Sequence, residues 1–171
     1  MEKVVVIMRG VPGSGKSTVT NILKAMTPDN IAIHSTDNFF IRDGVYKWSA
    51  DQLYKAHEWN KDEFYKSVNA GVACVICDNT NLAQKEYKPY VQVAKSQGYT
   101  IVSVVFEPSD IAIHAQRNVH NVPVESIMNM MTKLMNNMNT VGVDEEILIT
   151  AQMSLPEVEK VMTDKFIRYC N

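Results

Sequence analysis

The sequence has no apolar run that approaches the roughly 20 residues needed for a bilayer-spanning helix. It also has no excess of positive charge, because 17 Lys and Arg residues face 19 Asp and Glu residues and the formal net charge is −2. These absences argue against a transmembrane protein and against a protein built to wrap long nucleic acid. No low-complexity segment or internal repeat is present, so residues 1–171 are predicted to form a single domain with its own core.

Cysteine is scarce as well, with Cys74, Cys77 and Cys170 only. The odd number, and the absence of an export signal in MEKVVVIMRG, predict free thiols in the reducing cytosol and hence a cytoplasmic protein. Cys74 and Cys77 have the spacing of half a zinc site, but no second Cys or His pair completes it. The apolar run GVACVICDN predicts a buried strand, on which these two side chains point to opposite faces.

Strand and helix signals alternate along the chain. Apolar runs predict strands over 3–9, 30–35, 72–77, 99–107 and, less regularly, 145–151. Helical periodicity and end signals predict helices over 16–26, 50–70, 83–97, from about 109, over 124–138, and near the end of the irregular segment 140–171. Ser49 and Gln52 form a capping-box pattern at the start of the 50–70 helix. The alternation predicts an α/β fold, an open parallel β-sheet flanked by helices on both faces.

The stretch GVPGSGKS, residues 10–17, fits the phosphate-loop pattern G-x-x-x-x-G-K-[ST] at every position, between a predicted strand and a predicted helix. Its glycines allow successive N–H groups to enclose a phosphate at the N-terminus of the helix. Lys16 is expected to reach the β- and γ-phosphates, and Ser17 to ligate Mg²⁺. The predicted cofactors are Mg²⁺ and ATP, with GTP as the other option. The predicted nucleotide site comprises Gly10, Val11, Pro12, Gly13, Ser14, Gly15, Lys16, Ser17 and Thr18.

The third predicted strand ends in CDNTN, residues 77–81. A hydrolysing P-loop ATPase usually carries an acidic pair here, one residue for Mg²⁺ and one to position water. Asp78 is suited to assist Mg²⁺, but Asn79 cannot serve as a base. The guanine-reading pattern N-K-x-D is also missing, so the sequence argues against a hydrolase and against a GTPase switch.

Asp37, in HSTDNFF, follows the second predicted strand and therefore falls at the carboxyl edge of the sheet, beside the phosphate loop. In that place a carboxylate can accept the proton of an attacking hydroxyl group. The alternative is an ordinary helix N-cap, since the segment is rich in capping residues. The two interpretations are about even on local sequence, and the phosphate loop upstream favours catalysis.

Arg117 lies in HAQRNVHNVP, residues 114–123, between two predicted helices. This arrangement is typical of a small helical kinase lid, here about 117–124, which closes over ATP and supplies an arginine. A solvated surface arginine is the alternative.

On the 50–70 helix, Leu53, Phe64 and Val68 define an inward face that also carries His57 and Asn60. These two polar residues are either satisfied core groups or the lining of a polar site.

Six segments in the same order resemble the P-loop kinases related to NEDD4-binding protein 2, which are similar in turn to the kinase domain of phage polynucleotide kinase. The resemblance covers roughly residues 3–134 and rests on GVPGSGKST, STDNFF, AHEWN, DNTN, PYVQVAKSQGY and RNVHNVP. It implies a P-loop kinase fold and phosphorylation of a hydroxyl group, in the closest enzymes the 5′-OH of RNA or DNA. By position it implies that Asp37 is the general base and Arg117 the lid arginine. It also places Asp78, Asn79 and Asn81 along the site.

One position departs from this pattern. The phage enzyme has an arginine three residues after its catalytic aspartate, which contacts the acceptor phosphate, whereas this chain has Phe40. Arg42, two residues later, is the candidate replacement. The first expectation is thus a polynucleotide 5′-hydroxyl kinase with a short or terminal nucleic-acid acceptor. The alternatives are a kinase of a small alcohol, such as a nucleoside or antibiotic, and an ATP-binding module without transfer activity. The candidate acceptor residues are Asp37, Arg42, His57, Asn60, Asn79 and Asn81.

Overall fold

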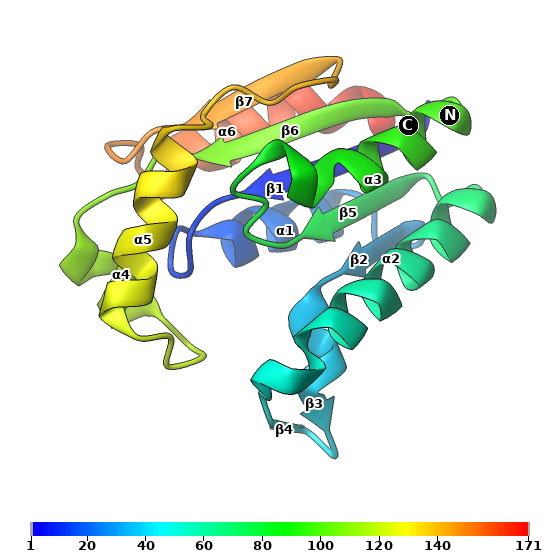
Figure 1. Ribbon diagram of the computed structural model, residues 1–171. Helices are drawn as coiled ribbons and strands as arrows, with labels where there is room; N and C mark the ends of the chain where they lie inside the picture. The colour runs from blue at the N-terminus through cyan, green and yellow to red at the C-terminus, as the bar shows by residue number, and fades with distance from the viewer. Residues whose placement is uncertain (1, 171) are drawn as a thin grey trace.

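The computed structural model describes residues 2–170, and a parallel five-stranded sheet lies at its centre (Figure 1). The strand order is β2-β5-β1-β6-β7, and every neighbouring pair is parallel. The middle strand is buried along its whole length, which explains its uninterrupted apolar sequence. The bounds are β1 (Val4–Arg9), β2 (Ile31–His34), β5 (Cys74–Asp78), β6 (Thr100–Phe106) and β7 (Glu145–Ile149).

Helices cover both faces of this sheet, as Figure 1 shows. On one face α1 (Lys16–Met26) and α6 (Leu155–Phe166) pack through Leu23, Met162 and Phe166. On the other, α2 (Leu53–Asn69) and α3 (Gln84–Ser96) pack through Phe64 and Tyr90. The predicted fold class is therefore confirmed. Two further helices, α4 (Ile111–Arg117) and α5 (Val124–Met135), lie beyond the carboxyl end of β6, and a short 3₁₀ turn, η3 (Ile167–Tyr169), follows α6.

The sequence-based prediction missed a hairpin between β2 and α2. After the 3₁₀ turn η1 (Thr36–Phe40), strands β3 (Ile41–Arg42) and β4 (Val45–Tyr46) pair in antiparallel fashion. They are joined by Asp43 and Gly44, whose φ angles are 52° and 76°. Positive φ at both central residues is typical of two-residue hairpins, in which Asp-Gly is a preferred pair.

The predicted start of the helix over 50–70 is wrong in two respects. Residues Ala50–Gln52 form a separate 3₁₀ turn, η2, and α2 begins only at Leu53. The Ser49 hydroxyl group donates to Asp51 and makes no capping bond to a helix N–H group. Leu53 is 38% exposed, so it does not belong to the inward face, whereas Phe64 and Val68 are buried as predicted.

Arg9, at the end of β1, joins three parts of the chain. Its side chain is fully buried, and its guanidinium group lies 4.8 Å from the centroid of the Tyr87 ring. It donates to two carbonyl groups just after β5 and to three acceptors just after α5, so it fixes the end of α5 against the sheet. The acceptors are the carbonyl oxygens of Asn81, Leu82, Asn137 and Met138 and the hydroxyl oxygen of Thr140.

Cys74 and Cys77 are both buried and belong to the hydrophobic clusters on opposite faces of the sheet, as predicted. Burial raises the pKa of each thiol to about 12, so both stay protonated near neutral pH. Within residues 2–170, no group of three or more His, Cys, Asp and Glu side chains is arranged to hold a metal ion. None of the helices described is both long and apolar enough to cross a membrane.

Candidate active site

The phosphate-loop sequence forms the connection between β1 and α1, and two of its glycines are required by close packing. Gly13 has φ of +75°, and a Cβ atom there would lie 2.6 Å from the His114 carbonyl oxygen. A Cβ atom at Gly10 would lie 2.5 Å from Ser14 Oγ and 3.1 Å from Phe106 Cβ. Side chains at these positions would force the loop open, so the loop backbone depends on both glycines.

Lys16 is folded back over this loop. Its ammonium group donates to the carbonyl oxygens of Gly10, at 2.9 Å, and Val11, at 3.0 Å. Burial lowers the pKa of Lys16 to about 8, although the negative charges of Asp78 and Asp37 act in the opposite direction. Burial also raises the pKa of the Asp78 carboxyl group, against the attraction of Lys16. The cation at the start of α1 and two carboxylates, one at the end of β5 and one in the turn after β2, therefore share one electrostatic environment.

Ser17 and Thr18 are exposed in the first turn of α1, and this turn contains no acidic residue. The first turn thus adds no carboxylate of its own to the positive end of the helix, which suits a bound phosphate. Ser17 and Asp78 supply hard oxygen atoms of the kind that Mg²⁺ prefers. Mg²⁺ in nucleotide sites typically takes one or two protein ligands and completes its shell with phosphates and water. These two residues fit such a site.

Asp37 lies inside η1, and Ser35 occupies the N-cap position of that turn. The capping interpretation of Asp37 therefore does not describe its contacts. Its side chain is 49% exposed, and it accepts a hydrogen bond of 3.2 Å from the Tyr46 hydroxyl group. The second carboxylate oxygen lies 3.6 Å from Nε2 of His120. Neither Tyr46 nor His120 was among the residues that the sequence singled out.

Asn79 and His57 hold the turn that carries Asp37. The Asn79 side-chain oxygen accepts a 2.9 Å hydrogen bond from the Thr36 backbone N–H, which ties the end of β2 to the end of β5. Nδ1 of His57 lies 3.3 Å from the Thr36 hydroxyl oxygen. Burial lowers the pKa of His57, which favours the neutral imidazole beside this hydroxyl group. Both residues therefore position the turn that carries Asp37 by bonding to Thr36, and neither of these bonds involves the Asp37 carboxylate.

The other three predicted acceptor residues are differently placed. Asn60 is fully buried and donates a 3.0 Å hydrogen bond to the Tyr90 hydroxyl group. Asn81 is buried too, and its side chain donates to the Met8 carbonyl oxygen at 2.7 Å, joining the ends of two strands. Arg42 is exposed on β3, with Gln52 Oε1 at 3.5 Å as its hydrogen-bond partner. Asn60 and Asn81 therefore support the walls of the site.

The segment predicted as a lid consists of the end of α4, the loop over 118–123 and the start of α5. Arg117 is exposed, and its Cβ atom lies 3.1 Å from the position of a Cβ atom at Gly13. His114 attaches α4 to the phosphate loop. Its Nε2 accepts a hydrogen bond from the Ser109 N–H at 2.8 Å, so Nδ1 carries the hydrogen and donates to the Gly13 carbonyl oxygen at 3.2 Å.

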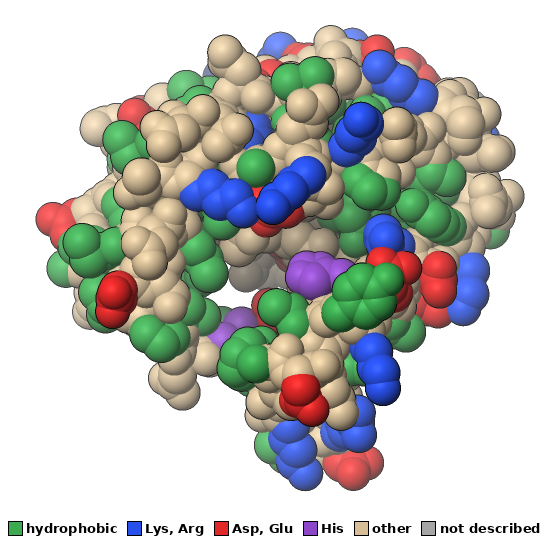
Figure 2. Space-filling view, viewed as in Figure 1, with side chains coloured by type: hydrophobic (Ala, Val, Ile, Leu, Met, Phe, Trp, Pro, Cys, Tyr) green, Lys and Arg blue, Asp and Glu red, His purple; other side chains and the backbone are tan. Residues whose placement is uncertain are grey.

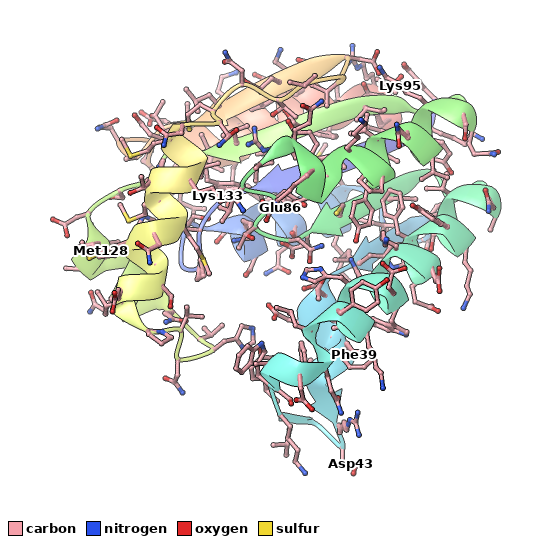
Figure 3. The ribbon with its side chains drawn as sticks, in the orientation of Figure 1. Phe39, Asp43, Glu86, Lys95, Met128 and Lys133 are labelled. Atoms are coloured by element: carbon pink, nitrogen blue, oxygen red, sulfur yellow. The ribbon has the colours of Figure 1, made fainter. Side chains whose placement is uncertain are left out.

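The face shown in Figure 2 is hollowed between the β3–β4 hairpin and the α4–α5 side, with histidine side chains at the rim. Glu86, in the first turn of α3, and Lys133, on α5, point toward one another in Figure 3, and their charged groups lie 3.0 Å apart. Asp43 lies at the far tip of the hairpin in the same view. The hollow is thus bordered by the hairpin on one side and by α5 on the other.

A parallel five-stranded sheet, a glycine loop between β1 and α1, and short helices over the carboxyl edge define a P-loop kinase fold. The family described as "AAA domain" matches residues 5–136, and the chain belongs to this family. This match and the curated relative described next confirm the predicted resemblance.

NEDD4-binding protein 2 from Homo sapiens is 34% identical over 134 residues, which cover 75% of this chain and 7% of that protein. The chain therefore spans about 7% of the length of this curated relative. A fungal RNA kinase has a TM-score of 0.64 and 16% identity, with 98% of this chain and 44% of that chain covered. A gluconokinase from Sinorhizobium meliloti 1021 has a TM-score of 0.58 and 16% identity, with coverage of 99% and 93%. These two structures support the fold.

Proposed function

We propose that the protein is an ATP-dependent phosphotransferase in which Asp37 activates an acceptor hydroxyl group. The observation that carries this proposal is the Asp37 carboxylate, half-exposed after β2 and in one electrostatic environment with Lys16. Asp37 takes the hydroxyl proton while the acceptor oxygen forms a bond to the γ-phosphorus atom. The bond between that phosphorus atom and the β–γ bridging oxygen breaks, and ADP leaves with the electron pair.

The roles that we propose for the other site residues follow from their charges and from their positions around the phosphate loop. Lys16 turns from the loop carbonyl groups to the β- and γ-phosphates, and Arg117 brings positive charge to the transferring group from the lid over 117–124. Mg²⁺, held by Ser17 and Asp78, would neutralise phosphate charge. The loop N–H groups hold the phosphates in place. GTP is the second option, and running the transfer assay below with labelled GTP in place of labelled ATP decides the nucleotide preference.

We propose the 5′-OH of RNA or DNA as the acceptor. The likeness to a fungal RNA kinase supports this choice. Asp37 lies between the hairpin and the 118–123 loop, so a chain end reaches it more easily than the middle of a duplex. Arg42 and Lys47 are exposed on the hairpin side of Asp37, where the acceptor phosphates would follow.

A small alcohol is the second candidate, and Phe40 is the observation that favours it. Phe40 is 2% exposed and packs against Phe39, Tyr46 and Trp48, so the position of the phage arginine is filled by an aromatic core residue. Arg42 is directed to Gln52 and makes no hydrogen bond to Asp37 in the described residues. The likeness to a gluconokinase supports the same candidate.

The test measures transfer of labelled γ-phosphate to a 5′-OH oligonucleotide and to a panel of nucleosides, sugars and antibiotics. Asp37→Asn should lower transfer by about 10²- to 10⁴-fold, because it removes the base, while ATP binding is retained. Asp43→Asn is the matched control, since Asp43 lies at the exposed hairpin tip (Figure 3).

Each outcome of this assay selects one candidate. Transfer to small alcohols alone would replace the polynucleotide acceptor, and tight ATP binding with no transfer would identify a binding module. Asp37→Asn with nearly full transfer would show that Asp37 is not the base.

A further inference from the structure

Two side chains from distant parts of the sequence meet on the Asp37 carboxylate. Tyr46, on β4, donates its hydroxyl hydrogen to one oxygen, and His120, in the 118–123 loop, lies beside the other. The two rings are stacked, with their centroids 4.1 Å apart and their planes inclined by 29°. The 118–123 loop and the hairpin are therefore in contact directly above the proposed base.

The Tyr46 ring packs against the core residue Phe40. Phe40, which is buried, contacts it edge-on at a centroid distance of 6.2 Å. Burial, with Asp37 as a second cause, raises the pKa of Tyr46 to about 12, so its hydroxyl group remains a donor at neutral pH. The Tyr46 side chain is thus fixed by two contacts, the packing of Phe40 against its ring and the hydrogen bond from its hydroxyl group to Asp37. The ring face that His120 covers is a ready-made surface for a planar group.

In this stack of two rings, His120 is held less firmly than Tyr46. His120 is about one-third exposed, and neighbouring Val119 is 82% exposed, so the 118–123 loop buries little around them. An exposed pair between a histidine and a carboxylate holds the loop only weakly. A nucleobase has a larger π surface than an imidazole ring and gains more by stacking on an aromatic side chain. A base is therefore able to displace His120.

We infer that the Tyr46 ring is the platform for the nucleobase of the acceptor's first nucleotide, and that His120 occupies this platform until the acceptor displaces it. This inference rests on the proposed polynucleotide acceptor. A 5′-terminal nucleoside carries a planar base at one end and its 5′-OH at the other, and Tyr46 likewise runs from the ring face that His120 covers to the Asp37 carboxylate. Stacking of the base on the ring therefore directs the 5′-OH to Asp37.

The positive charges of the hairpin suit an acceptor strand that continues from Tyr46 along the hairpin. Arg42 and Lys47 flank β4 and are exposed, and Trp48 is 55% exposed next to them. A phosphate backbone leaving Tyr46 along the hairpin meets two cations and a second exposed ring, a combination typical of single-strand binding. If the first base stacks on Tyr46, efficient phosphorylation requires that the first nucleotide of the acceptor carries a base.

The experiment compares two acceptors that differ only in their first nucleotide, a 5′-OH oligonucleotide with an intact base and the same oligonucleotide with an abasic 5′ residue. For the unmodified protein, KM should be at least about tenfold higher with the abasic acceptor. Relative to Tyr46→Phe, which also lacks the hydroxyl donor to Asp37, Tyr46→Leu should remove this difference by raising KM for the intact acceptor alone. Tyr46→Phe keeps the ring and should keep the difference, which guards against a folding defect. Tyr54→Leu, at a 76% exposed position on α2, is the matched control.

His120→Ala should change KM in the direction opposite to Tyr46→Leu. Because it removes the group that competes for the platform, it should lower KM for the intact acceptor, while Tyr46→Leu raises it. A raised KM in His120→Ala, or full base discrimination in Tyr46→Leu, would overturn the inference. Equal phosphorylation of both acceptors by the unmodified protein would overturn it too and leave the proposed function standing. Transfer to neither acceptor would remove the polynucleotide function itself.

Discussion

Arg9→Met is a substitution for which the structure predicts a large loss of stability. Arg9 is fully buried at the end of β1, and its five hydrogen bonds end on carbonyl groups and a hydroxyl group rather than on a carboxylate. Burial lowers the pKa of its guanidinium group, although charged residues nearby act in the opposite direction. Methionine has a similar length but donates nothing, so all five acceptors lose their partner.

The size of the effect follows from how buried these acceptors are. The bonds to Asn81, at 2.8 Å, and to Leu82, at 3.1 Å, are buried, so each lost bond leaves an unsatisfied carbonyl group that costs about 1–3 kcal/mol. The three bonds to residues after α5 are only partly buried, and water can replace part of each. The desolvation cost of the cation is recovered at the same time. Together these contributions give a loss of about 3 kcal/mol in the free energy of unfolding.

Urea denaturation followed by circular dichroism measures this loss, with thermal melting as a second readout. A loss of about 3 kcal/mol corresponds to a decrease of about 6–12 °C in Tm for a domain of this size. Arg42→Met is the matched control and should change the unfolding free energy by less than about 0.5 kcal/mol, since Arg42 is exposed. If Arg9→Met cost less than about 1 kcal/mol, the view of Arg9 as the joint between β1, the end of β5 and α5 would be refuted.

Two further predictions concern protons. Because burial holds the pKa of Lys16 near 8, the free protein loses this charge above pH 8, and ATP affinity measured by calorimetry should fall about tenfold per pH unit there. Lys16→Arg keeps its charge, so a pH-independent affinity is expected for it, and an equally flat profile for the unmodified protein would contradict the assignment. Burial lowers the pKa of His114 below its ordinary value of 6.5, so the unfolded chain binds more protons and the stability present above pH 6.5 is lost as the pH falls through the native pKa. His114→Asn should remove part of this acid sensitivity in urea titrations between pH 7 and 5, whereas an unchanged slope would mean that His114 does not stay neutral in the fold.

The fold was largely predictable because its main elements carry strong periodic signals. The β1 run of apolar residues, the glycine loop and α1 form one continuous motif, and α1 begins and ends where predicted, at Lys16 and Met26. The β3–β4 hairpin was missed because each strand has only two residues and shows no alternation. Its Asp43-Gly44 pair was the available signal. The capping pattern at Ser49 misled the prediction because Ser49 bonds to Asp51 instead of to a helix N–H group.

The site was predictable where a motif fixes the backbone and not where side chains meet through tertiary folding. Lys16 begins the helix that follows β1, Asp78 ends β5 and Asp37 lies in the turn after β2, so the carboxyl edge of three neighbouring strands brings them near one another. Tyr46 and His120 are far apart in the chain and meet only because the 118–123 loop reaches the hairpin. His114 gave no signal either, since its two hydrogen bonds depend on the path of the phosphate loop.

The central claim is that a hydroxyl group is activated by Asp37 beside the phosphate loop. Its most direct test is a crystal structure with a non-hydrolysable ATP analogue, Mg²⁺ and a 5′-OH dinucleotide. We expect the 5′-oxygen to lie within hydrogen-bonding reach of the Asp37 carboxylate, about 2.6–3.2 Å, on the side of the γ-phosphate. A 5′-OH bound away from Asp37, with the nucleotide seated in the loop, would contradict it.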